Sequence, residues 1–198
     1  MTEHPWYAEV PPDNPLMQGD LIEPCAVLVF GQLPVLAELQ DPEKLVDVLQ
    51  KSAGIEKVRA IVMTQACDLE QRHVRNVILC PIYHLEEFRV EWEKTERGRG
   101  QNPTPGSWAK FIKRIRDGNV WNLSMLKKRD SPESGGLAIP HQVVDFHEVF
   151  SLPLEFLELW MRASGANRLR LLAPYREHLS QAFARFFMRV GLPEDIEL

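Results

Sequence analysis

Two apolar segments rich in β-branched residues constrain the fold of this chain more than any other feature. One covers residues 58–65 (VRAIVMTQ), the other covers residues 74–82 (VRNVILCPI), and a polar stretch over 66–73 separates them. Short apolar runs with polar boundaries are typical of buried strands. The pattern therefore predicts two adjacent strands inside the core of the protein.

Other segments predict shorter strands and amphipathic helices. Residues 19–30 fit a strand bent at Pro24, because proline cannot donate a hydrogen bond to a ladder. Further strands are expected over 120–126, 142–146 and 167–172, and helices over 41–49, 108–118, 152–161 and 177–190. Residues 85–94 fit a helix or a strand. The Gly/Pro-rich residues 97–107 predict a loop, with Ser107 as the N-cap of the helix that follows.

Strands and helices do not alternate regularly along the chain, which disfavours a doubly wound α/β fold. We expect a mixed α+β fold instead, a small β-barrel with helical insertions and a C-terminal amphipathic helix. A chain of 198 residues suits one core and hence one domain. The expected organisation is an extended N-terminal arm over 1–18 and a single barrel domain over 19–198, with insertions at 31–57 and 84–140.

Composition indicates a cytoplasmic protein without a membrane partner. No apolar stretch approaches the roughly 20 residues of a membrane-spanning helix. The N-terminus also lacks the basic start and apolar centre of a secretory signal. Three widely spaced cysteines, Cys25, Cys67 and Cys80, do not suit a disulfide framework, so free thiols are expected.

The positive charge of the chain is concentrated in one segment. Residues 94–130 contain ten Lys or Arg against three acidic residues, whereas the net charge of the whole chain is -5. Aromatic residues accompany these cations, and single-stranded nucleic acid is bound by stacking of bases on rings and pairing of phosphates with cations. The candidate nucleic-acid-binding residues are Lys110, Lys113, Arg114, Arg116, Trp121, Lys127, Lys128 and Arg129.

Two other interpretations of this basic segment stay open. In the first, it is a solvated helix face over a buried stripe, with Trp108 and Phe111 facing inward. In the second, it binds an acidic protein partner. Monomer and homodimer also both stay open.

Two stretches of the chain together resemble the PemK/MazF-like toxin family, whose members are small SH3-like β-barrels. Residues 19–22 (GDLI) are similar to the opening strand of that family. Residues 59–64 (RAIVMT) and residues 78–82 (ILCPI) are similar to its second and third strands. The resemblance implies an SH3-like form for the expected barrel.

The resemblance also implies an activity. Enzymes of that family cut single-stranded RNA without a metal or cofactor, using an arginine at the start of the second strand and a threonine or serine just after the Pro-Ile of the third. Arg59 occupies the first of these positions, and Tyr83 occupies the second. The family relation would make the chain a toxin-antitoxin-like endoribonuclease or a component of a phage-defence or mobile-element system.

A dense polar segment follows the first apolar strand and supplies the remaining catalytic candidates. Strand ends that lead into loops often carry functional side chains. With Arg59 stabilising the phosphate, Thr64, Asp68 or His73 would move protons, and Cys67 would act as a nucleophile if a histidine served as its base. The plain alternative is that Thr64 and Asp68 satisfy turn amides and Cys67 is a small buried side chain.

A zinc site from Cys67, His73, Cys80 and His84 is disfavoured, because their spacing lacks the short ligand pairs of zinc ribbons and fingers. Three functional hypotheses therefore remain. The first is a PemK/MazF-like protein that engages single-stranded nucleic acid, RNA rather than DNA, with or without cleavage. The second is a non-catalytic adaptor that binds a partner protein through its insertions, which Tyr83 and the acidic remainder of the chain favour. The third is a hydrolase that depends on Cys67.

Overall fold

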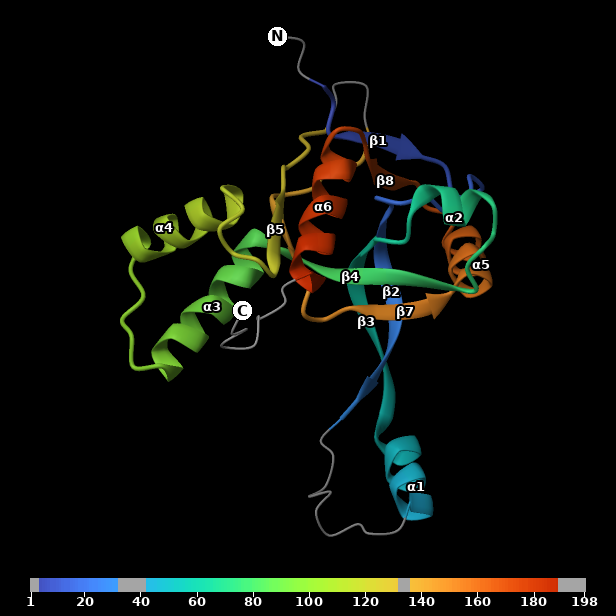
Figure 1. The fold of residues 1–198 in the computed structure, drawn as a ribbon, viewed down its shortest axis with the longest axis horizontal. Helices are drawn as coiled ribbons and strands as arrows, with labels where there is room; N and C mark the ends of the chain where they lie inside the picture. The colour runs from blue at the N-terminus through green and yellow to red at the C-terminus, as the bar shows by residue number, and fades with distance from the viewer. Residues whose placement is uncertain (1–3, 32–41, 132–135, 189–198) are drawn as a thin grey trace, which may run out of the picture.

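The computed structural model describes residues 4–31, 42–131 and 136–188. The fold is mixed α+β, as expected (Figure 1). The strands are β1 (Tyr7–Val10), β2 (Leu21–Phe30), β3 (Ala53–Val62), β4 (Asn76–His84), β5 (Leu123–Leu126), β6 (Gln142–Asp145), β7 (Phe150–Pro153) and β8 (Arg168–Leu171). The helices are α1 (Pro42–Ser52), α2 (Ala66–Glu70), α3 (Leu85–Gly98), α4 (Pro105–Arg116), α5 (Leu154–Ser164) and α6 (Tyr175–Phe187).

The main sheet is built around the two apolar segments that the sequence singles out. They form β3 and β4, which pair antiparallel with Ile61 opposite Cys80, and all three residues Ala60, Ile61 and Val62 are fully buried. The strand order is β2-β3-β4-β6-β5, and β7 pairs with the first half of β4. The prediction of two adjacent buried strands is confirmed.

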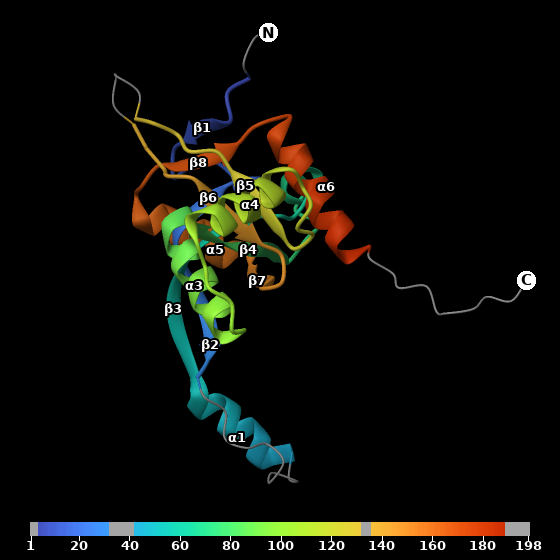
Figure 2. The same ribbon diagram turned by 90° about the vertical axis from the view of Figure 1, so that its left-hand side faces the viewer.

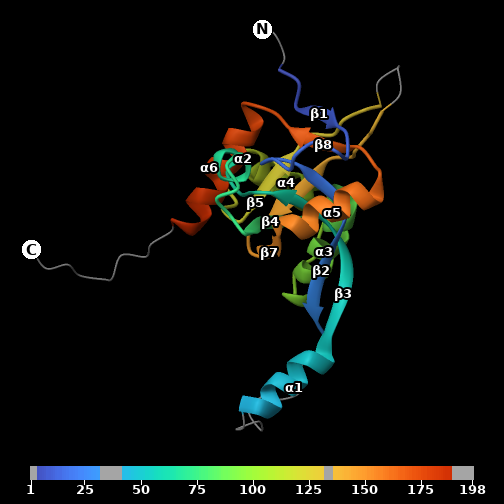
Figure 3. The same cartoon turned by 90° about the vertical axis from the view of Figure 1, so that its right-hand side faces the viewer.

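The expected closed barrel is not confirmed. In the described part of the chain, the six-stranded sheet is open, with β2 and β5 at its edges, and β1 and β8 form a separate two-stranded sheet. The physical reason is visible in the lengths of the strands. The outer halves of β2 and β3 extend away from the body as a two-stranded ribbon instead of curving round to meet the short strand β5 (Figures 1 and 3).

The N-terminal segment is attached to the body by a sheet and a buried ion cluster. Strand β1 pairs antiparallel with β8, at the end of the body opposite the ribbon (Figure 2). The buried carboxylate of Asp20 accepts hydrogen bonds from Arg168 Nε at 2.8 Å and Arg170 Nη2 at 2.9 Å. Arg168 also donates to three backbone carbonyls of the same segment, those of Pro11, Asn14 and Pro15. Within the expected N-terminal arm, the extended strand β1 and the segment up to Asp20 are therefore attached to β8.

The helices cover the sheet on both faces. One cluster of buried side chains lies between the sheet and α6, with Phe146, Leu171 and Leu179 among its members. A second cluster packs α5 against β3 and β4, and a smaller third cluster packs α3 and α4 against β5 and β6. The amphipathic helix expected at the C-terminus is therefore present as α6 and closes one side of the core.

The two expected insertions contain most of the protruding structure. Of the first, over 31–57, residues 32–41 lie outside the described residues, and the rest forms α1 and the outer half of β3. The second, over 84–140, forms α3, α4 and β5, so residues 85–94 are helical. The N-cap of α4 is Thr104, whose side chain accepts from the backbone N–H of Ser107, so the expected cap at Ser107 is wrong by one helical turn.

Candidate nucleic-acid interface

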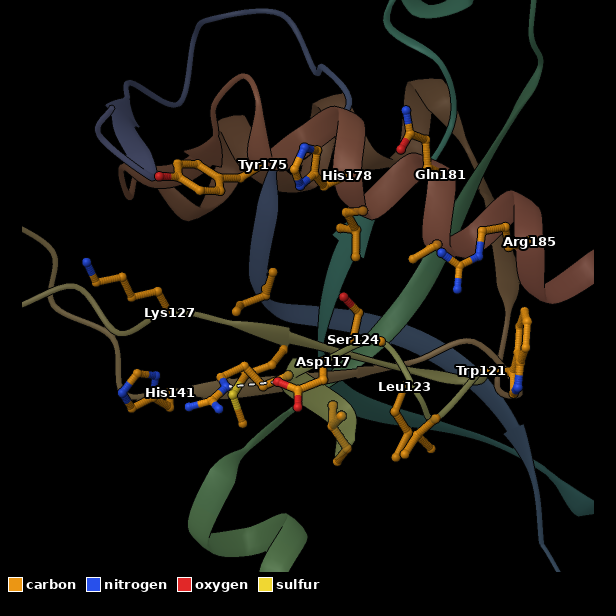
Figure 4. A pocket seen from close by; sticks show the side chains of 18 of the residues that line it. Asp117, Trp121, Leu123, Ser124, Lys127, His141, Tyr175, His178, Gln181 and Arg185 are labelled. Atoms are coloured by element: carbon orange, nitrogen blue, oxygen red, sulfur yellow. Dashed lines mark hydrogen bonds and ion pairs between the residues drawn. The ribbon is translucent and has the colours of Figure 1, made fainter. Parts of the chain in front are cut away.

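A groove with a volume of about 610 Å³ separates α6 from β5 and the segment that follows α4. Figure 4 shows the arrangement of its side chains. Helix α6 forms one wall and carries Tyr175, His178, Gln181 and Arg185. The opposite wall carries Asp117, Trp121, Leu123, Ser124, Lys127 and His141. The groove thus combines a long apolar floor with polar groups at both walls.

The walls of the groove carry more positive than negative charge. Three permanent cations line it, namely Arg116, Lys127 and Arg185, against the single carboxylate of Asp117. A hydrogen bond from Lys113 and another from Arg116 lower the pKa of Asp117 despite a smaller opposing effect of desolvation, so this group is ionised and already paired. The unpaired positive charge that remains favours an anionic ligand.

Lys127 and Arg185 are the cations best placed to bind that ligand. Within the described residues, neither side chain has an ion-pair partner, whereas Arg116 is held 3.3 Å from Asp117. The guanidinium of Arg185 lies over the ring of Trp121, with its carbon 5.2 Å from the ring centre. Such a stack leaves the N–H donors at the edge of the guanidinium available for a phosphate.

Aromatic rings lie near both ends of the groove. At one end, the Trp121 side chain is 49% exposed, which is unusual for so large an apolar group. At the other end, Trp6 and Tyr175 stack with ring centres 3.9 Å apart and an interplanar angle of 15°. Exposed and stacked rings of this kind are platforms for nucleobases.

A second hollow extends the groove beyond Lys127. It shares Trp6, Lys127 and Tyr175 with the first hollow and adds Lys128 and Arg129. Lys128 Nζ pairs with the exposed Asp130 at 3.0 Å, a contact that water and salt weaken. Arg129 is less available, since it pairs with Glu9 at 3.4 Å and donates to the carbonyl of Leu137. The basic surface therefore continues through Lys128 more than through Arg129.

The structure divides the candidate nucleic-acid-binding residues into two groups. Arg116, Trp121 and Lys127 line the groove, and Lys128 and Arg129 line its extension. The other three lie outside both hollows, on exposed positions of α4: Lys110, Lys113 and Arg114.

The aromatic residues of α4 face inward, as the plainer interpretation of the basic segment expected. Trp108 packs against Trp92 of α3 with ring centres 5.1 Å apart, and Phe111 packs against the same ring at 5.5 Å. The rings of Trp108 and Phe111 are therefore occupied by contacts within the protein and do not stack with a ligand beside the cations of α4. The groove and its extension each combine cations with aromatic rings.

Arg59 is engaged in ion pairs and is not presented to a substrate. Its Nη2 atom lies 2.6 Å from Glu87 Oε1, and its Nε lies 3.4 Å from Glu23 Oε1. Desolvation would raise the pKa of Glu87, but the hydrogen bond and charge of Arg59 outweigh it and the pKa is lowered. Arg59 thus serves to hold the start of α3 against the sheet in this structure.

The remaining catalytic candidates lie apart from Arg59. Thr64 lies in a bend two residues beyond the end of β3, and its Oγ1 accepts the N–H of Ile78 at 2.7 Å. The backbone N–H of His73 donates to the carbonyl of Asp68, and no described contact joins the His73 ring to Cys67 or Asp68. Thr64 is thus engaged with the backbone of β4, and no described contact joins Arg59 to any of the other four candidates.

The cysteines show how different their environments are. Cys67 is exposed on the short helix α2, whereas Cys25 and Cys80 are buried. Burial raises the pKa of the Cys25 thiol to about 11 and that of Cys80 to about 12. Cys80 is therefore shielded from solvent, whereas Cys67 is accessible to it. Within the described residues, no group of three His, Cys, Asp or Glu side chains is placed to hold a metal ion.

The position expected to carry a small hydroxyl residue is occupied by Tyr83, whose side chain has another role. Its hydroxyl donates a hydrogen bond to Glu148. Burial raises the pKa of Tyr83, and the hydrogen bond to the Glu148 carboxylate raises it further. The side chain ties β4 to the loop after β6.

Sequence reasoning did not select the α6 wall as a binding surface. Tyr175, His178 and Arg185 follow each other at intervals of three and seven residues, which places them on one stripe of a helix. The core stripe beside it contains Leu179, and Phe183 packs partly against the same cluster. The sequence signal that could have identified this wall is the helical spacing of Tyr175, His178 and Arg185, which forms a polar stripe beside the apolar stripe of the same helix. Trp6 and His141 had no such signal, because only the tertiary fold brings them to the groove.

Comparison with protein-family models, with curated proteins and with solved structures finds no match to this chain. The relation to the PemK/MazF-like family therefore stays a prediction. None of the described helices is long and apolar enough to cross a membrane.

Proposed function

We propose that this protein binds single-stranded nucleic acid in the groove between α6 and β5. The observation that carries the proposal is the joint presence, in one hollow, of two cations without an ion-pair partner among the described residues and of three aromatic rings, of which Trp121 is exposed and Trp6 and Tyr175 are partly buried. Phosphates would pair with Lys127 and Arg185, and bases would stack on Trp121 and on the Trp6 and Tyr175 pair.

The dimensions of the groove suit a short stretch of one strand. Tyr175 and Arg185 stand ten residues apart on α6, which corresponds to about 15 Å along the helix axis. At a stacked spacing of about 3.4 Å, this length holds about four nucleotides. A duplex keeps its base faces inside the stack, so the rings of the groove could not contact them.

Polar side chains on both walls favour RNA over DNA. Ser124 and Gln181 can each donate and accept a hydrogen bond, and they face the groove together with His178. A ribose 2′-hydroxyl is itself both donor and acceptor, and it is the group that distinguishes RNA from DNA. RNA is also the ligand that the PemK/MazF-like resemblance implies, and an SH3-like origin of the sheet belongs to the same proposal.

Cleavage of the bound strand is not part of the proposal. The endoribonuclease hypothesis depends on an arginine that is free to contact a phosphate, and Arg59 is held between Glu23 and Glu87. The hydrolase hypothesis depends on a base beside Cys67, and the only side-chain contacts of its Sγ in the described structure are with Gln65 and Asp68. The groove supports binding without either residue.

The test is a comparison of two charge-matched double variants. Fluorescence anisotropy would be measured with a labelled single strand of about twelve nucleotides, as RNA and as DNA, and with a duplex. Lys127→Gln with Arg185→Gln removes two groove cations, and Lys110→Gln with Arg114→Gln removes two cations of α4 that lie outside it.

We expect the groove variant to bind single-stranded RNA at least tenfold more weakly, because each direct phosphate contact is lost. The α4 variant should lose less than about threefold, through long-range attraction alone. Equal losses in the two variants would show that general positive charge attracts the strand, and absence of binding by the unaltered protein would refute the proposal.

A further inference from the structure

The outer halves of β2 and β3 form a two-stranded ribbon that projects from the body and ends at α1 (Figures 1 and 3). The ladder continues in register from Ala26 opposite Lys57 to Phe30 opposite Ala53. None of residues 28–31 or 43–57 belongs to a buried core cluster of the described structure. We call the described residues 26–31 and 42–57 the β-arm.

One face of the β-arm is an exposed apolar stripe. Leu28 and Ile55 are directly opposite each other in the ladder, so both side chains point to the same face, and Phe30 lies two residues further on that face. Their exposed fractions are 53% for Leu28, 71% for Ile55 and 51% for Phe30. Contiguous exposure of large apolar side chains is rare on a monomer and marks an interaction surface.

Helix α1 extends the exposed apolar area at the tip. Its residues Val46 and Leu49 are both exposed, although the helix is amphipathic and should bury one side. A two-stranded hairpin with a short helix is only marginally stable in water without a surface to pack on. The β-arm therefore has the composition of an element that is completed by a partner.

We propose that the partner is a second copy of this chain, whose β-arm packs face to face with the first about a two-fold axis. Residues 42–57 contain three acidic residues and three lysines, so they carry no net charge, whereas the chain as a whole carries -5. Two identical β-arms meet without electrostatic repulsion, and a strongly basic or acidic partner would find no opposite charge there. A two-fold axis sets the same stripe against itself, and interfaces of this type are more apolar than others.

The proposed dimer is independent of nucleic-acid binding. The β-arm projects away from α6 and β5, so the groove stays open in both copies (Figure 1). Loss of the dimer would therefore leave the groove intact, and loss of RNA binding would leave the dimer intact.

The test is the mass of the full-length protein in solution, measured by sedimentation velocity from about 5 to 100 µM. The unaltered chain of 22.8 kDa should sediment with twice that mass at the higher concentrations. Ile55→Lys places two like charges against the facing stripe and should yield the monomer mass. Leu28→Thr, which replaces leucine by a smaller β-branched residue that suits a strand, should raise the dimer dissociation constant at least tenfold.

The matched control is Leu159→Lys, because Leu159 is a 64% exposed leucine on α5 of the body. This variant should dimerise as the unaltered protein does. Unchanged circular dichroism would show that each variant is folded. A monomer of the unaltered protein at 100 µM would overturn the proposal and return the β-arm to the adaptor hypothesis, and a dimer that persists in both β-arm variants would overturn it equally.

Discussion

The buried carboxylate of Asp20 is expected to be among the most sensitive positions of the whole chain. Asp20 is fully buried, and the side chain of Arg168 that donates to it is only 5% exposed. Asp20→Asn keeps the shape of the side chain but removes its charge, so the Arg168 guanidinium loses its counter-ion inside the protein. Removing one partner of a buried ion pair costs about 3–5 kcal/mol.

The structure places this case at the lower end of that range. Arg168 keeps its hydrogen bonds to the carbonyls of Pro11, Asn14 and Pro15, which partly solvate the charge. We therefore expect a loss of about 3 kcal/mol in the free energy of unfolding. With a urea slope of about 2–3 kcal/mol/M, the midpoint of unfolding would fall by about 1–1.5 M.

Equilibrium urea unfolding followed by circular dichroism measures this change. The control is Glu91→Gln, which breaks the exposed contact between Glu91 and Lys94 and should cost less than about 1 kcal/mol. If Asp20→Asn shifted the midpoint no more than the control does, the ion cluster would not be the anchor of the N-terminal segment.

The remaining predictions concern pH, thiol reactivity and salt. Hydrogen bonds to Glu9, first from Asn167, lower its pKa in the folded state below 4.5. Its contribution to stability is therefore full above about pH 4.5 and is lost as the pH falls through the lower folded value, so Glu9→Gln should flatten the fall of the unfolding midpoint below about pH 4.5. A thiol reagent should modify Cys67 alone in the native protein and reach Cys25 and Cys80 only after denaturation; three rapid modifications would contradict the burial of those two. The logarithm of the RNA-binding constant should fall with that of the salt concentration with a slope between about -1.4 and about -2, since the groove offers two or three available cations at about 0.7 each, and a slope near zero would exclude phosphate contacts.

Local patterns in the sequence predicted most of the elements but not their closure. The β-branched segments became β3 and β4, and the helical spacing of apolar residues located α4 and α6, because both patterns depend on the burial of one face. Strands β1 and β7 were not predicted. Each has only four residues, and its strand conformation depends on pairing with a partner strand more than on its own composition. The barrel was not confirmed because closure depends on the direction of the outer ribbon, which no local pattern encodes.

The candidate site was predicted in part for a similar reason. Lys127 and Trp121 lie in a segment whose charge stands out along the chain, so the sequence could single them out. Arg59 was selected through a resemblance to a family, and its neighbours Glu23 and Glu87 come from distant parts of the chain. Whether a charged side chain is free or paired is a property of the tertiary fold. That property favours the groove with Lys127 over the surroundings of Arg59 as the binding site.

The most direct test of the account is a map of where the protein contacts RNA. Ultraviolet cross-linking of a labelled single strand, followed by mass spectrometry of the digested protein, identifies the peptides that touch the bases. We predict cross-links at Trp121 and at Trp6 or Tyr175, all lost when Lys127 and Arg185 are both replaced by Gln. Cross-links confined to α4 or to the surroundings of Arg59 would contradict the assignment of the groove as the nucleic-acid site.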